Sequence, residues 1–371
     1  MGPASNCRIV VVATTSAVLV LTAVLPAGLR ARATPTAASC TAARTSMTPT
    51  GWSAARTGSS VPVRPSAAPL ALVADVPLPG PAKRFDYQSF DPANGRLYIS
   101  HMRGDRLDVF DTRTSTLVAS NEGFPGATGV WVVPERHRVF VSVTGRHEVL
   151  VVDDRTLAVV ASVGGAAFPD GIAYAPAEDR VFVSDESGGV DLVIDATRAT
   201  RVGLIALGGE AGNTHYDAPS HCIVVAVQTR NELVAIDPAS QKVVARWLVP
   251  CDHPHGFLID EPERLAFVSC EGDSKLLVVD LRTMRTTATL PVAEGPDVLA
   301  FDPGLRWLYV ASESGSLSVF GERNGTLTPV GVYRAPHSHT VAVDPSTHRV
   351  YLPLQDVGGR PLLRILVPTT S

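Results

Sequence analysis

The sequence repeats itself with a period of about 42 residues over most of its length. In one register, an aspartate ends an apolar run at steps of 42, 42, 42 and 43 residues, at Asp111, Asp153, Asp195, Asp237 and Asp280. In a second register, the start of an apolar run steps by 42 or 43 residues through Asp86, Thr128, Asp170, Gly212, His255, Asp297 and His339. Periods of this size in an apolar, turn-rich chain are typical of four-stranded β-propeller blades. Seven such positions predict seven blades.

Each unit has the same order of strands and turns. In the third unit, an inner strand begins at Asp170, a polar turn follows, and an alternating apolar strand occupies 180–184. The third strand ends at Asp195, whose carboxylate can accept backbone N–H groups in an Asx-turn. No segment has a sustained helical period of apolar residues. The predicted fold is therefore an all-β propeller of seven four-stranded antiparallel blades, with almost no helix.

The last unit contains only three strands of its own, predicted at 340–344, 349–354 and 362–367. A ring that did not close would leave open strand edges, which favour aggregation. The strand-like segment 69–77 precedes the first complete unit, and we expect it to become the outer strand of the last blade. The predicted propeller therefore spans residues 69–368.

The N-terminal region has the composition of an export signal followed by a linker. Arg8 precedes an apolar run from Ile9 to Leu25, and residues 31–33 read Ala-Arg-Ala, a cleavage pattern. Residues 1–33 are therefore predicted to direct export, and they are either cleaved or retained as a membrane anchor. Residues 34–68 are rich in Thr, Ala, Ser and Pro and are predicted to form a disordered tether. We expect a periplasmic, secreted or cell-surface location.

Charge limits the classes of partner. Only 18% of the 371 residues are charged, the net charge is −4, and no long basic run occurs. Nucleic-acid binding requires clustered lysine and arginine, so nucleic acid is not expected as a partner. A small molecule or a protein is expected instead, and membrane contact is expected only through an uncleaved N-terminal segment.

Two sets of polar residues are predicted to meet at one end of the central channel, because inner strands begin there and second strands end there. The first set is Asp86, Thr128, Asp170, Asn213 (beside Gly212), His255, Asp297 and His339. The second set lies sixteen residues later and comprises Met102, Thr144, Glu186, Gln228, Glu271, Glu313 and Gln355, with His101 and Cys270 adjacent. His253 and His337 each precede a histidine of the first set by two residues.

This concentration of imidazoles and carboxylates predicts binding of an ion or a polar ligand. Mixed nitrogen and oxygen donors suit a divalent transition metal, whereas oxygen donors alone would suit calcium. The candidate metal ligands are His253, His255, His337 and His339. The candidate ligand-binding residues are Asp86, His101, Asn213, Gln228, Glu271 and Gln355. The candidate catalytic acids or bases are Asp170, Glu186, Asp297 and Glu313. Each carboxylate can instead belong to a structural network.

Three of the five cysteines lie in the predicted propeller. Cys251 and Cys270 approach the same end of the channel, and after export a disulfide between them is the leading interpretation. A thiolate metal ligand is the alternative. Cys222 is expected to be buried and unpaired, and Cys40 is expected to lie outside the fold.

Several strand sequences are similar to those of YncE-like proteins, the YVTN-repeat seven-bladed propellers. The sequences are RLYIS (96–100), RVFVS (138–142), WLYVAS (307–312) and HTVAVDPSTHRVYLP (339–353). The resemblance covers about 70–368 and implies an exported protein that binds rather than an established enzyme. Related propellers include sugar-lactone hydrolases, but no site motif of theirs occurs in this sequence.

The expected function is therefore that of an exported binding or scaffold protein. Its channel mouth would take a small ligand, a metal ion or a loop of a partner protein. One alternative is a metal-assisted hydrolase or lyase, similar to a lactonase, acting at the same mouth. The other is a platform for protein interactions that uses the outer blade surface.

Overall fold

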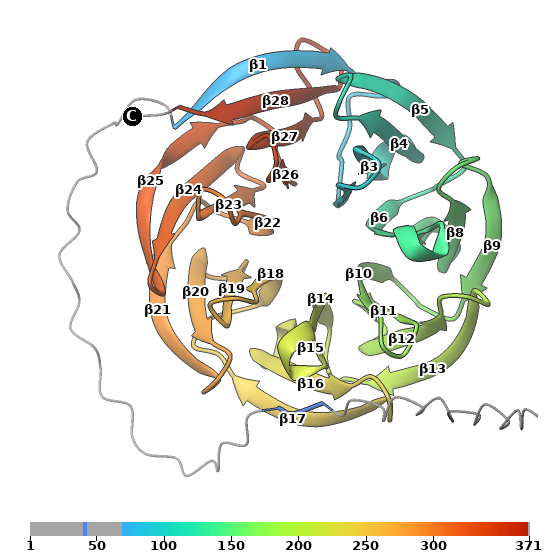
Figure 1. Ribbon diagram of the computed structural model, residues 1–371, viewed down its shortest axis with the longest axis vertical. Helices are drawn as coiled ribbons and strands as arrows, with labels where there is room; N and C mark the ends of the chain where they lie inside the picture. Colours follow the sequence, from blue (N-terminus) through green and yellow to red (C-terminus); the bar gives the residue numbers. More distant parts are fainter. Residues whose placement is uncertain (1–39, 43–68, 370–371) are drawn as a thin grey trace, which may run out of the picture. The chain divides into compact units, whose positions relative to one another are not determined.

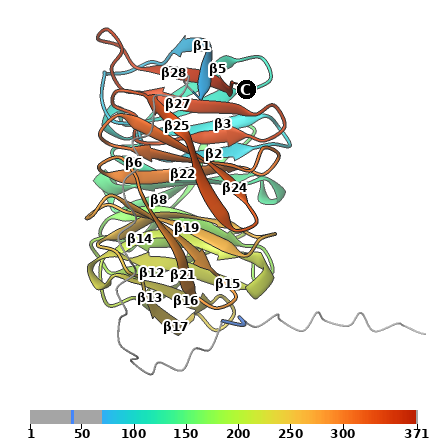
Figure 2. The ribbon, with the colours of Figure 1, turned by 90° about the vertical axis from the view of Figure 1, so that its left-hand side faces the viewer.

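The computed structural model describes residues 40–42 and 69–369, all of which belong to one compact unit, Ala37–Ser371. Seven four-stranded antiparallel sheets form a ring (Figure 1), and Figure 2 shows this ring from the side. The predicted seven-bladed all-β architecture is confirmed. Among the described residues, no helix is long and apolar enough to cross a membrane. The predicted export signal, 1–33, lies outside the described residues, as does most of the predicted tether.

The strands of each blade follow one another from the channel to the rim. The first blade contains β2 (Gln88–Asp91), β3 (Arg96–His101), β4 (Arg106–Asp111) and β5 (Thr116–Glu122). The second contains β6 (Ala127–Val133), β7 (Arg138–Val143), β8 (Glu148–Asp153) and β9 (Val159–Gly164). The third contains β10 (Pro169–Ala175), β11 (Arg180–Asp185), β12 (Val190–Asp195) and β13 (Thr200–Ala206). The fourth contains β14 (Ala211–Asp217), β15 (Cys222–Val227), β16 (Glu232–Asp237) and β17 (Lys242–Leu248).

The remaining three blades have the same plan. The fifth contains β18 (Pro254–Asp260), β19 (Leu265–Cys270), β20 (Lys275–Asp280) and β21 (Arg285–Pro291). The sixth contains β22 (Pro296–Asp302), β23 (Trp307–Ser312), β24 (Ser316–Arg323) and β25 (Thr326–Arg334). The seventh contains β26 (Ala342–Asp344), β27 (Arg349–Leu354), β28 (Leu362–Pro368) and β1 (Leu70–Pro77). Five 3₁₀ turns are the only helical elements of the described residues: η1 (Met102–Gly104), η2 (Pro134–Arg136), η3 (Thr144–Arg146), η4 (Ala218–Ser220) and η5 (Gln228–Arg230).

The ring is closed by the N-terminal strand, as predicted. β1 pairs antiparallel with β28, with Leu70 opposite Pro368 and Pro77 opposite Leu362. Figure 1 shows β1 in blue along the outer edge of β28 in red. The last blade therefore combines the two ends of the propeller sequence, and this pairing covers the edge that β28 would otherwise leave open.

The hydrophobic core lies between neighbouring blades. The middle strands of the third blade, β11 and β12, are buried at every position except the first, whereas the rim strand β21 alternates between exposed and half-buried residues. Clusters of buried side chains join adjacent blades, and one of them contains Val224 of β15 and Val268 of β19. Each fully buried valine contributes about 1.5–3 kcal/mol relative to an exposed one, so blade-to-blade packing holds the ring together.

The aspartates that end the third strands have a structural role, as the repeat predicts. The Asp111 carboxylate accepts the backbone N–H groups of Arg113 and Thr114, each at 3.0 Å. The Asp153 carboxylate accepts the N–H of Arg155 at 3.1 Å in the next blade. These carboxylates fix the tight turn into the fourth strand and lie outside the channel.

Glycines allow the inner strands of consecutive blades to approach one another. A Cβ atom on Gly129 would lie 1.9 Å from the carbonyl oxygen of Asp170, and one on Gly256 would lie 1.8 Å from that of Asp297. No larger residue fits this separation without a shift of the backbone. The close approach places residues that start consecutive inner strands side by side.

The structure corrects the expectations for Cys222 and Cys40. Cys222 is not an unpaired thiol, because it forms a disulfide with Cys40, 182 residues away in the sequence. Thr41 donates its backbone N–H to the carbonyl of Ser220 at 2.9 Å, and Ala42 packs against the core between the fourth and fifth blades. Cys40–Ala42, inside the predicted tether, is therefore part of the folded domain. No repeat signal exists at Cys40, because this segment contributes no strand.

Candidate functional site

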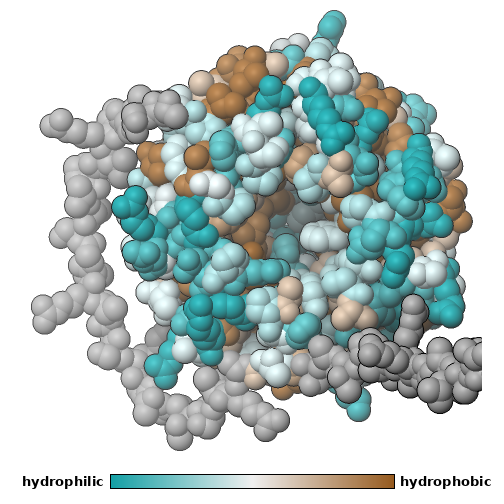
Figure 3. All heavy atoms as spheres, viewed as in Figure 1, coloured by the Kyte–Doolittle hydropathy of each residue, from teal (hydrophilic) through white to brown (hydrophobic). Residues whose placement is uncertain are grey.

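A polar cavity of about 320 Å³ opens at one end of the channel, and Figure 3 shows a hollow at the centre of the ring. The carboxylates that line this cavity, here called the mouth, are Asp86, Asp170, Glu186, Glu271, Asp297 and Glu313. Arg84 and Arg103 are its arginines, and His255 also lines it. The carboxylates outnumber the cations, so the mouth carries an excess of negative charge.

Asp297 lies at the centre of the mouth between two histidines. Its Oδ2 atom is 2.9 Å from Nε2 of His339, and its Oδ1 atom is 3.4 Å from Nε2 of His255. The side chain of Asp297 is only 3% exposed. The two histidines begin inner segments two blades apart, and the carboxylate from the blade between them bridges the gap.

Two sets of side chains that could bind a metal ion share Asp297. One consists of His255, Glu271 and Asp297, and the other consists of Asp297, Glu313 and His339. Within each group, one ligand atom from every residue lies within 4.8 Å of the others. We call them the His255 half-site and the His339 half-site. The repeat predicted all five residues for the mouth.

Arg84 occupies the His339 half-site, and the sequence analysis did not identify it. Its Nη1 atom donates to Oε1 of Glu313 at 2.6 Å, and its Nη2 atom is 2.9 Å from Nε2 of His339. The same Nη2 atom lies 4.0 Å from Oδ2 of Asp297. Arg84 belongs to the loop between β1 and β2 and lies two residues before Asp86, the repeat position that His253 and His337 hold in other blades. That register was the available signal.

Tyr87 is the second residue that the sequence analysis missed. Its hydroxyl lies 3.3 Å from Oδ2 of Asp170 and 3.3 Å from Nε2 of His255. The six equivalent repeat positions hold smaller residues, three of them glycine, so the single aromatic residue was the signal: Gly129, Gly171, Asn213, Gly256, Val298 and Thr340.

The Tyr87 side chain also marks the inner boundary of the mouth. It lines both the mouth and a second cavity of about 450 Å³. All seven inner strands contribute to this second cavity, largely with apolar and aromatic side chains such as Trp131 and Phe257. The channel therefore has a polar end and a more apolar interior.

The pKa values of the mouth residues reflect its negative charge. Burial, together with the nearby Asp86 carboxylate, raises the pKa of Asp170 to about 8. Burial alone would lower the pKa of His255, but Asp297, Glu271 and Asp170 together raise it to about 9. The pKa of His339 is also raised, against the effect of burial, by Asp297. The buried carboxylates thus favour positive charge on the groups around them.

One buried polar atom of the mouth, Nδ1 of His255, lacks a hydrogen-bond partner. His255 is more than nine-tenths buried. Oδ1 of Asp297 and Nδ1 of His339 have only ion-pair neighbours, at 3.4 Å from Nε2 of His255 and 3.3 Å from Oε1 of Glu313. An unpaired buried polar atom costs free energy unless a ligand, ion or water satisfies it. Nδ1 of His255 therefore points to a bound species in the mouth.

The two other histidines predicted as metal ligands lie outside both half-sites. His253 is exposed, and its Nδ1 atom is 3.1 Å from Oδ1 of Asp252. His337 is also exposed and lines a smaller cavity beside the mouth together with His339 and Gln355. Both adopt a left-handed backbone, with φ of 51° and 60°, which matches a role in shaping loops.

Four predicted ligand-binding residues do not line the mouth, and one of them is Gln355, which lines the smaller cavity beside it. His101 is buried within the first blade, where it stacks on Phe85 with ring centroids 4.0 Å apart. Asn213 lines the apolar interior of the channel, because Gly212 takes the repeat position at the mouth. The Gln228 amide is buried and lies 3.4 Å from Oε1 of Glu186, to which it donates.

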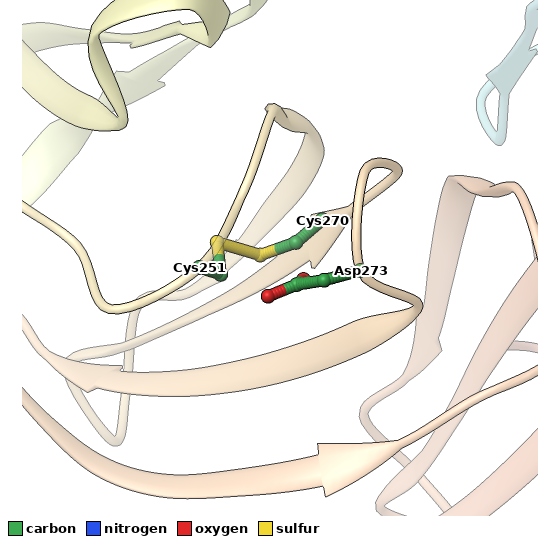
Figure 4. A group of neighbouring side chains, drawn as sticks. All are labelled: Cys251, Cys270 and Asp273. Atoms are coloured by element: carbon green, nitrogen blue, oxygen red, sulfur yellow. A yellow bond between two sulfur atoms is a disulfide. The ribbon is translucent and has the colours of Figure 1, made fainter.

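Cys251 and Cys270 are joined by a disulfide with a Cα–Cα distance of 6.0 Å. Figure 4 shows the bonded sulfurs beside the side chain of Asp273. Neither sulfur is a thiolate, so this group does not offer the metal ligands that the alternative interpretation required. The disulfide ties the loop before β18, which leads to His255, to the end of β19, which leads to Glu271.

Comparison with solved structures supports the fold. The chain is similar to one from Kuenenia stuttgartiensis hydrazine synthase, with a TM-score of 0.67 and 15% sequence identity over 85% of this chain and 99% of that chain. At this identity the similarity shows the fold alone. No protein-family model matches the sequence, and no curated protein matches it. The YncE-like family therefore stays a prediction.

Proposed function

We propose that this chain is an exported β-propeller binding protein that holds a divalent transition metal ion in its channel mouth. The ligands are His255, Glu271 and Asp297. The observation that carries the proposal is the convergence of these three side chains, with ligand atoms within 4.8 Å of one another, in a cavity lined by six carboxylates.

The donor types favour a transition metal over calcium. Imidazole nitrogen suits zinc, copper, nickel or iron, whereas calcium takes oxygen ligands. Ligands around zinc lie about 2.0–2.2 Å from the ion. The Glu271 side chain is only partly buried, so its rotation can close the set around an ion. The Oδ1 atom of Asp297 faces this half-site, 3.4 Å from Nε2 of His255.

Export is part of the proposal. Two disulfides, Cys40–Cys222 and Cys251–Cys270, are suited to an oxidising compartment. The signal-like composition of residues 1–33 agrees with this location. A small molecule or a loop of a partner protein would approach the ion from the open end of the mouth.

A metal-assisted hydrolase or lyase is the second candidate. Asp170 and the Tyr87 hydroxyl favour it, because they lie beside His255 without belonging to its half-site: the hydroxyl is 3.3 Å and the Asp170 carboxylate 4.0 Å from Nε2. A carboxyl group in this place can transfer protons to a substrate held at the ion.

Elemental analysis of full-length protein expressed with export tests the proposal. We expect one transition-metal ion per chain, which is lost in the His255→Asn and Asp297→Asn variants. His253→Asn is the matched control, because His253 is two residues away and exposed, and it should retain the ion. Protein that folds but binds none of zinc, copper, nickel or iron would contradict the proposal and favour an interaction platform. Metal-dependent hydrolysis of lactones or esters that Asp170→Asn abolishes would establish the second candidate.

A further inference from the structure

We propose that the mouth is a two-cation site in which Arg84 permanently takes the place of a second metal ion. The wild-type chain then binds one ion, in the His255 half-site, and loss of the Arg84 guanidinium converts the mouth into a site for two. This inference rests on the proposed metal-binding function and concerns what limits its stoichiometry.

The two half-sites have the same composition. Each has one histidine, one glutamate and one oxygen of the shared Asp297 carboxylate. Oδ1 faces His255 and Oδ2 faces His339, at 3.4 and 2.9 Å. A carboxylate whose two oxygens face different ligand groups is the arrangement that bridges paired ions, which lie about 3.5–4 Å apart in two-metal sites. The geometry of Asp297 is therefore that of a bridge.

Arg84 makes the contacts that an ion in the His339 half-site would make. Its guanidinium reaches Glu313 at 2.6 Å, His339 at 2.9 Å and Asp297 at 4.0 Å. The guanidinium fills the space beside Nε2 of His339 and Oε1 of Glu313 that an ion would have to occupy, and two cations in that space would repel each other. Guanidinium and metal ion are therefore mutually exclusive here.

The His255 half-site has no arginine or lysine of this kind. Among the residues that the structure describes, Glu271 forms no ion pair with an arginine or lysine, and the ion pairs of His255 are with Asp170 and Asp297. Each half-site contains two carboxylates, whose negative charge a neighbouring cation stabilises. Arg84 supplies a permanent cation to one half-site, whereas no arginine or lysine does so in the other.

The position of Arg84 makes its removal feasible. Its side chain is 39% exposed, and it comes from the loop before β2 rather than from a blade core. The backbone stays anchored when the side chain changes, because the Arg84 carbonyl accepts the N–H of Arg103 at 3.0 Å. Substitution therefore exposes Glu313, His339 and Oδ2 of Asp297 without opening the ring.

Zinc stoichiometry, measured by native mass spectrometry and by isothermal titration, tests the inference. We expect one zinc ion in the wild type, two in Arg84→Ala and Arg84→Gln, and one in Arg84→Lys, which keeps a cation. The double variant Arg84→Ala/His339→Asn should return to one. Circular dichroism melts establish that each variant is folded, and Arg84→Gln keeps the test valid if Arg84→Ala is unstable.

The outcomes separate this inference from the function on which it rests. One zinc ion in the wild type and one in both Arg84→Ala and Arg84→Gln would overturn the inference and leave the metal-binding function intact. Two ions in the wild type would also overturn it, because Arg84 would then not exclude the second ion. No zinc in either protein would overturn both.

Discussion

Substitution of Gly256 by alanine tests whether close approach of the inner strands builds the mouth. The new Cβ atom would lie 1.8 Å from the carbonyl oxygen of Asp297 and 2.8 Å from Oγ of Ser269. Ordinary van der Waals contact begins at 3.4 Å, so the Cβ atom and the carbonyl oxygen must separate by about 1.6 Å. The backbone of Gly256 is not in the left-handed region, and the cost therefore measures crowding alone.

This separation has consequences for stability and for binding. Overpacking of a well-packed interior costs about 1–3 kcal/mol, and because the contact involves backbone of the next blade we expect a loss of about 3 kcal/mol in the free energy of unfolding. His255 precedes Gly256 directly, and Asp297 is the displaced neighbour. Binding constellations tolerate displacements of about 0.5 Å, so we expect zinc affinity to fall at least tenfold.

Urea unfolding and zinc competition with a chromogenic chelator measure the two effects. Gly164→Ala is the matched control, because Gly164 ends the rim strand β9, no atom lies within 4 Å of its added Cβ, and its φ is not positive. The control should stay within about 0.5 kcal/mol of the wild type, as surface substitutions usually do. Wild-type stability and wild-type zinc affinity in Gly256→Ala would show that the close approach of the inner strands does not build the mouth.

Two further predictions concern parts of the ring away from the mouth. Burial raises the pKa of Asp191 to about 8, so between about pH 4 and pH 8 the folded state binds a proton that the unfolded state lacks. The free energy of unfolding therefore falls as pH rises through this range, by up to about 6 kcal/mol. Urea midpoints at pH 5 and pH 8 should differ less in Asp191→Asn than in the wild type, and an equal difference would contradict this. In a chain-entropy model, a disulfide stabilises the folded state more when it closes a longer loop. Cys40–Cys222 closes a loop of 182 residues and contributes at most about 5 kcal/mol to the free energy of unfolding. Cys251–Cys270 closes a loop of 19 residues and contributes at most about 3 kcal/mol. Serine substitution of the first pair should therefore lower the melting temperature more than substitution of the second, and the reverse order would contradict the model.

The repeat made the architecture and most of the mouth predictable. A fixed 42-residue step requires equivalent residues to take equivalent places in successive blades, so His255, Asp297 and His339 could be placed together before any coordinates. The same step assigned Glu271 and Glu313 to the second set of mouth residues. The repeat therefore predicted all five residues of the two half-sites.

Side chains whose direction depends on the fold of a loop could not be placed in this way. Arg84 lies in the connection between β1 and β2, and its reach to Glu313 depends on how that loop folds over the ring. Cys40 reaches Cys222 through a segment with no strand pattern. His101 shows the opposite failure: its register is adjacent to the mouth, but its side chain turns into the first blade and stacks on Phe85. A period locates the backbone of a residue and leaves the direction of its side chain open.

The most direct test of the account is the position of the ion. Crystals of the wild-type protein grown with zinc, with diffraction data collected on both sides of the zinc absorption edge, would locate it by anomalous scattering. We predict one anomalous peak per chain, between His255, Glu271 and Asp297, with the Arg84 guanidinium still on Glu313. A folded ring with no peak in the mouth, or with a peak elsewhere on the surface alone, would contradict the account.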